Sequence, residues 1–206
     1  MTRRLTDGLW STQILTIIRS IPWIISGTVA LCRGCIPTPP GRDLRSPLSE
    51  QLANYWLAAA RAGYAKPDNW QAWADRFILS VPAPPLWVIN MSMAQDVEQL
   101  RRALAEKLES EWETGTVTSS DDAEIGYAWL RYQKREIALA DCLRLAGDRA
   151  DAGTSHIECE IIYDLLNRLE AGEPQARVES EARRLLAPFA EMAQRQWEII
   201  SNMATL

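Results

Sequence analysis

The sequence predicts an all-α fold: an antiparallel bundle of six or seven helices behind a different N-terminal segment. From Ser46 onward, apolar residues recur at intervals of three and four, which is the period of a helix with one buried face. No stretch alternates apolar and polar residues long enough to indicate a half-buried strand. Capping residues, glycines and prolines divide the periodic stretches, and helices with short connections pack as antiparallel neighbours.

Residues 1–45 differ in composition from the helical domain predicted over residues 46–206. Their apolar stretch, within residues 9–31, is interrupted by Arg19 and Pro22, and a proline-rich linker follows. A membrane-spanning helix needs about 20 apolar residues, so the interruptions argue against one. The favoured interpretation is a loosely packed extension, while a signal peptide and a membrane-associated segment through residues 9–31 remain open.

The first two predicted helices are marked by proline at their starts. Ser46-Pro47 reads as an N-cap followed by proline at the first helical position, and Gly63 ends this helix. Pro67 opens the second helix, which continues until the prolines of residues 82–85 break the chain.

Three further segments are predicted in the middle of the chain. Residues 86–89 read as a buried helical turn, and the capping-box pattern from Ser92 to Gln95 begins a helix that runs to about Trp112. The same pattern, from Asp121 to Glu124, begins a long helix to Ala146, with Gly147 as its terminator.

The last two predicted helices follow a short polar loop. Ser155 and Glu158 form a third capping box, and the helix that they begin closes at Gly172. A final helical stretch runs to about Met203, and Pro188 is expected to kink or divide it because proline lacks the N–H of the helical hydrogen bond.

The charge of the chain is unevenly distributed. Residues 1–45 carry a net charge of +4, whereas residues 46–206 carry −9, so that the whole chain is at −5. An acidic body repels a phosphate backbone, which argues against nucleic acid as a partner. It fits either a solvated surface or a basic protein partner, such as a basic toxin. The four cysteines are too few for a disulfide scaffold, so a cytoplasmic location is predicted.

One set of residues has the composition of a zinc site. Cys32 and Cys35 are separated by two residues, as are His156 and Cys159, and such pairs reach one tetrahedral ion. Cys142 can replace one ligand. The competing interpretations are buried apolar thiols and, for Cys32 and Cys35, a redox pair without its usual βαβ context. The prediction is a chain without a cofactor, with the Cys₃His zinc site as the alternative.

Catalytic motifs are missing from the sequence. There is no G-x-S-x-G, no P-loop and no H-E-x-x-H, and His156 is the only histidine. A non-enzymatic, protein-binding domain is therefore predicted, while an enzyme with a dispersed site that uses His156 remains open.

A partner-binding surface is predicted at tryptophans that have charged residues as neighbours in the sequence. The chain has nine tryptophans, which serve either as core residues or as anchors at the centre of protein interfaces. Trp112 and Trp197 lie near helix ends among charged residues and are the better candidates for exposure. With them we place the acidic residues Glu109, Glu111 and Glu113 on the predicted partner-binding surface.

Two short motifs carry a resemblance to known proteins. W-A-D-x-x-I covers residues 73–78, and P-P-x-W-x-I-x-x-S covers residues 84–92. Together they resemble a pattern in small helical bacterial proteins, some of which look like immunity proteins of toxin systems. The resemblance implies a helical fold and a role in neutralising a toxin by direct binding, and it implies no catalytic residue.

Overall fold

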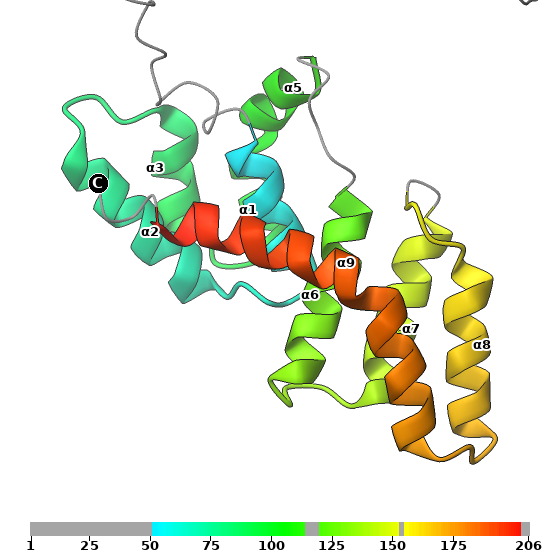
Figure 1. Ribbon diagram of the computed structural model, residues 1–206. Coiled ribbons are helices and arrows are strands. Elements are labelled where there is room, and N and C mark those ends of the chain that lie inside the picture. The colour runs from blue at the N-terminus through cyan, green and yellow to red at the C-terminus, as the bar shows by residue number, and fades with distance from the viewer. Residues whose placement is uncertain (1–50, 114–119, 153–154, 203–206) are drawn as a thin grey trace, which may run out of the picture. The chain divides into compact units, whose positions relative to one another are not determined.

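The computed structural model describes residues 51–113, 120–152 and 155–202, and within these ranges every regular element is an α-helix (Figure 1). The predicted all-α bundle is thus confirmed, although the described residues form nine helices where six or seven are predicted. The predicted extension of residues 1–45 and the Ser46-Pro47 cap lie outside the described residues. The helices are α1 (Leu52–Arg61), α2 (Pro67–Ser80), α3 (Leu86–Met93), α4 (Val97–Ala103), α5 (Ala105–Glu113), α6 (Ser120–Gln133), α7 (Leu139–Asp151), α8 (Cys159–Glu170) and α9 (Gln175–Asn202).

One hydrophobic core joins α1–α4 to parts of α6 and α9. Its centre is aromatic: Trp56 packs against Trp73 with ring centroids 5.7 Å apart, and Trp73 stacks on Trp87. Trp70 is fully buried, and its indole N–H donates to the carbonyl of Ala94 at 2.9 Å, which satisfies the polar atom that comes with burial. The motif residues Trp73 and Trp87 are therefore part of the packing between α2 and α3.

A second core is enclosed by α6, α7, α8 and the first half of α9, which stand side by side in Figure 1. Its buried positions include Ile125, Trp129, Leu143 and Ile162, spaced as the sequence periodicity predicts. Since α6 and α9 also contribute to the first core, both cores share these two helices.

The helix start predicted at Ser92 is wrong. Ser92 lies inside α3, where its hydroxyl donates to the carbonyl of Ile89. The next helix begins after Asp96, whose carboxylate accepts the N–H of Gln99 at 2.8 Å and so caps α4. The predicted helix to Trp112 is also divided, because α4 ends and α5 begins at Leu104.

The long helix predicted over residues 121–146 is two helices. The chain leaves α6 after Gln133 and turns through Arg135, which has a left-handed φ of 60°. Gly147 lies within α7 and does not end it; a Cβ at this position would meet the ring of Tyr163 at 2.6 Å. The glycine here serves the close packing of α7 and α8.

The end of the chain departs less from expectation. Pro188 lies inside α9, which continues from Gln175 to Asn202 without division. α8 begins at Cys159, and its N-cap Glu158 makes no side-chain cap hydrogen bond, so the predicted capping box does not form. Gly63 and Gly172 do follow the ends of α1 and α8 with positive φ, as predicted.

None of the helices in the described ranges combines the length and the apolar character needed to cross a membrane. The segment of residues 9–31, for which membrane association remains open, lies outside these ranges.

Candidate functional site

The predicted zinc ligands are only partly within the described residues. Cys32 and Cys35 lie outside them, whereas His156 precedes α8 and Cys159 is its first residue. The thiol of Cys159 contacts the carboxylates of Glu160 (3.4 Å) and Asp151 (3.7 Å). In the described ranges no three histidine, cysteine or acidic residues are grouped to hold a metal ion. The zinc site thus stays a prediction that depends on residues 32–35.

His156 has instead a carboxylate partner, which the sequence did not reveal. Asp122, near the start of α6, accepts the imidazole Nδ1–H, the backbone N–H of His156 (2.9 Å) and the hydroxyl of Ser155 (2.8 Å). The imidazole is 81% exposed while Asp122 is buried. This pattern fastens the segment before α8 to α6, and it turns Nε2 toward solvent. The hydroxyl of Ser155 faces the carboxylate, so these three residues do not form the serine–histidine relay of a hydrolase.

A buried carboxylate connects three helices. Glu124 on α6 lies fully buried between Arg149 on α7, at 2.7 Å, and Arg61 on α1, at 3.6 Å. Burial raises the pKa of Glu124 to about 7, because the loss of hydration outweighs the attraction of Arg149 and Arg61, and Asp121 adds to the rise. Glu124 therefore changes charge near neutral pH, where an ordinary glutamate is fully ionised.

This raised pKa gives a pH-dependent stability. A carboxyl group whose pKa is higher in the folded than in the unfolded protein stabilises the fold below pH 4.5, and this contribution is lost as the pH rises through about 7. We expect Glu124→Gln to remove up to about 3 kcal/mol of the fall in unfolding free energy between pH 5 and pH 8. Urea denaturation at both pH values measures it.

The matched control is Glu191→Gln, which changes an exposed carboxylate on α9. It should leave the pH dependence of the wild type intact. If Glu124→Gln has the same pH slope as the wild type, the two arginines compensate for the burial of Glu124.

The predicted partner surface is divided by the structure. Trp112 is 70% exposed, and Glu109 and Glu113 are exposed beside it on α5. Glu111 points the other way and is buried, so its predicted place on the surface is wrong. Trp197 is half-buried, and it packs edge-on against Trp56 with ring centroids 5.9 Å apart.

Glu111 serves α1, which has no side-chain cap of its own. Its two carboxylate oxygens accept the backbone N–H groups of Ala53 (3.1 Å) and Asn54 (3.0 Å) at the start of that helix. The negative charge also faces the positive end of the helix dipole. Burial raises the pKa of Glu111, while these two N–H groups and Lys107 oppose the rise.

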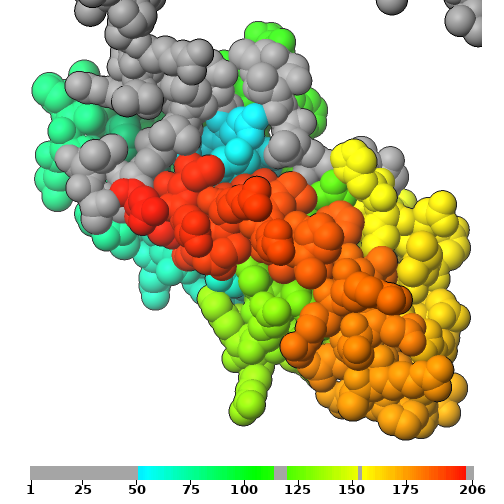
Figure 2. Space-filling view, viewed as in Figure 1, coloured from blue at the N-terminus to red at the C-terminus, as the bar shows by residue number. Residues whose placement is uncertain are grey.

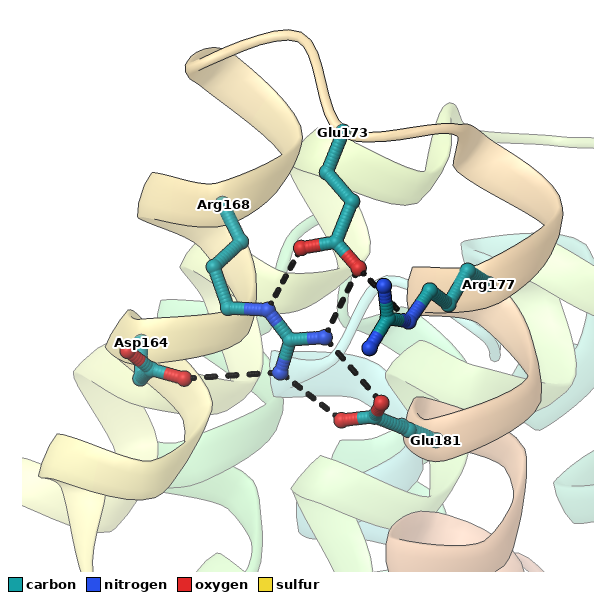
Figure 3. Close-up of polar contacts among 5 residues, drawn as sticks. All are labelled: Asp164, Arg168, Glu173, Arg177 and Glu181. Atoms are coloured by element: carbon teal, nitrogen blue, oxygen red, sulfur yellow. Dashed lines mark hydrogen bonds and ion pairs between the residues drawn. The ribbon is translucent and has the colours of Figure 1, made fainter.

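A group of charged side chains joins α8 to α9 (Figure 3). The guanidinium of Arg168 donates to both oxygens of Glu173 in the connecting turn and to both oxygens of Glu181 on α9, at 2.7–3.0 Å. Asp164 and Arg177 complete the group. The hydrogen bonds to Glu173 and then Glu181 raise the pKa of Arg168 further above its ordinary value, so this group holds the turn and moves no proton.

Among the described residues, Trp112 on α5 and the imidazole of His156 are thus both exposed to solvent. Comparison with known proteins adds no relative: the chain matches no protein-family model, no curated protein and no solved structure.

Proposed function

We propose that this chain is a non-enzymatic protein-binding domain that docks on a basic protein partner through the outer face of α5. The observation that carries the proposal is the exposure of Trp112, at 70%, beside the exposed carboxylates of Glu109 and Glu113. A large indole left in water is unfavourable for an isolated domain, and tryptophan is enriched among the residues that dominate binding energies.

The spacing of these residues suits a single contact area. Glu109 and Glu113 are four residues apart on a helix and Trp112 is three residues from Glu109, so all three lie on neighbouring rows of one face. Carboxylates attract lysine and arginine, and the indole face accepts a cation above its ring. The net charge of −9 on residues 46–206 favours rapid encounter with a positively charged partner.

A narrower proposal is that the partner is a toxin and the chain an immunity-type protein that neutralises it. This rests on the resemblance of residues 73–78 and 84–92 to such proteins. Direct neutralisation needs a complementary surface and no catalytic group, and the exposed α5 face is the surface proposed for it.

The test compares the partners that tagged full-length variants capture from the native cell. We expect Trp112→Ala to reduce capture of a basic protein by roughly tenfold or more, because loss of a central aromatic anchor removes a large part of the binding energy. Isotope-labelled mass spectrometry measures the ratio. Glu109→Gln combined with Glu113→Gln should slow association mainly at low salt, which surface plasmon resonance on the captured protein would show.

The control is Leu79→Ser, since Leu79 is an exposed apolar residue on α2, outside the α5 face. It should capture the partner as the wild type does. Capture that survives Trp112→Ala but is lost with Leu79→Ser would reject the α5 surface. A captured protein that shows toxicity only when this chain is absent would support the immunity role.

A further inference from the structure

Arg135 occupies a backbone position that the rest of the fold gives to glycine. The helices α1, α6 and α8 each end in a Schellman motif, in which two backbone N–H groups after the helix donate to carbonyls of its last turn. The residue in the left-handed conformation is Gly63 after α1, Arg135 after α6 and Gly172 after α8. Of the described non-glycine residues, Arg135 alone has a positive φ, of 60°. The left-handed conformation is unfavourable for a residue with a Cβ, so arginine at this position works against the local backbone preference.

This residue lines a pocket formed by described residues of α6, α7 and α9. The pocket, of about 900 Å³, lies between the end of α6, the connection to α7 and the start of α9. Figure 2 shows the light-green end of α6 projecting beside the orange first half of α9. The size is that of a small-molecule site. Besides charged groups, the lining has apolar and amide side chains from Tyr132, Gln133, Ile137 and Gln175.

The charges around the pocket leave one cation without a partner. Glu136 pairs with Arg131, Asp141 with Arg144, and Glu179 with Arg183. Among the described residues, no ion pair reaches Arg135, which is exposed at the pocket. The described part of the pocket thus offers one unpaired guanidinium, that of Arg135, and its three carboxylates are each paired with another arginine.

This arrangement selects for a carboxylate. A guanidinium presents two parallel N–H groups that match the two oxygens of a carboxylate. A dianion such as phosphate needs more than one cation to offset its charge, and this pocket offers a single unpaired guanidinium among its described residues, because the carboxylates around it already hold arginine partners. Apolar lining at Ile137 and the ring of Tyr132 suit a carboxylate attached to an apolar group.

We propose that this pocket is a binding site for a carboxylate with an apolar substituent, and that Arg135 binds its two oxygens. The carboxylate belongs either to a small free acid or to the C-terminal residue of a polypeptide. The site is separate from the α5 surface, so Trp112→Ala should leave carboxylate binding unchanged.

The test follows nuclear magnetic resonance shifts of the side-chain N–H of Arg135 in the isotope-labelled full chain. The probes are acetate, the tripeptide acetyl-Ala-Ala-Leu with a free carboxyl group, and its amide. We expect saturable shifts with the first two and none with the amide. Tripeptide binding at least about tenfold tighter than acetate points to a polypeptide C-terminus, because the added atoms then bind as well, whereas equal affinities point to a small acid.

Three variants separate the cation from the backbone strain. Arg135→Gly should abolish the shifts of neighbouring backbone amides and raise the melting temperature by a few degrees, since glycine adopts this φ freely. Arg135→Gln should abolish binding with the melting temperature unchanged. The control Arg76→Gln removes an exposed cation on α2 and should bind as the wild type does. Wild-type binding by Arg135→Gln, equal shifts with the amide, or no shift with either carboxylate would overturn the proposal.

Discussion

Replacement of Gly126 by alanine is expected to destabilise the fold by about 3 kcal/mol, because the helices α6 and α9 meet at this residue with no room for a side chain. A Cβ on Gly126 would lie 2.1 Å from the carbonyl oxygen of Phe189 and 2.9 Å from the Cβ of Ala193. The first of these atoms belongs to the backbone of α9, so the clash is relieved only by moving the whole helix. Urea denaturation followed by circular dichroism measures the loss.

Gly172→Ala provides the control for the glycine itself. Gly172 has a φ of 89° and no atom within 4 Å of the position a Cβ would take, so alanine there meets backbone strain alone. We expect a loss of about 1 kcal/mol. Equal stability of Gly126→Ala and the wild type would mean that α6 and α9 are further apart than the structure has them.

Replacement of Glu111 by alanine is expected to reduce the free energy of unfolding by about 2–3 kcal/mol. The change removes both carboxylate acceptors from the N–H groups of Ala53 and Asn54 at the start of α1. A buried donor that loses its acceptor keeps the full penalty of its lost hydration. Thermal and urea denaturation give the size of the effect, and hydrogen exchange at Ala53 and Asn54 locates it.

Glu109→Ala, two residues earlier on the same helix, is the matched control because Glu109 is exposed. Its effect should stay within about 0.5 kcal/mol. Glu111→Gln, which keeps one acceptor oxygen and loses the charge, should fall between these variants. A neutral outcome for Glu111→Ala would show that other groups cap α1.

The fold class could be predicted because helices with one buried face have a periodic sequence, which needs no knowledge of the partner elements. The helix start at Pro67 and the helix ends at Gly63 and Gly172 could also be predicted, because each of these residues acts through its own backbone conformation. Ser92 and Gln95 fit the capping pattern equally well, yet Asp96 caps α4. A local pattern offers several candidate starts, and tertiary packing selects one.

The contacts of the buried acidic residues were harder to predict, because they join residues that are far apart in the sequence. Glu111 accepts the backbone N–H of Ala53, 58 residues earlier, and Asp122 binds the backbone of His156, 34 residues later. In the sequence both look like ordinary helix-surface acids. Arg135 shows the opposite difficulty, since a left-handed helix end is expected to carry glycine and an arginine conceals it. The exposure of its side chain and the pocket that it lines can be seen only in the three-dimensional structure.

Because α6 and α9 contribute to both cores, the described helices have no internal boundary at which one half can separate intact. Detaching α7 and α8 would bare the apolar faces of α6 and of the first half of α9, and detaching α1 would bare the remainder of the same two helices. Each core thus depends on the other to keep α6 and α9 in place. We therefore expect the described helices to unfold in a single cooperative transition. A destabilising substitution anywhere along α6 or α9 should lower the free energy of unfolding of both cores together.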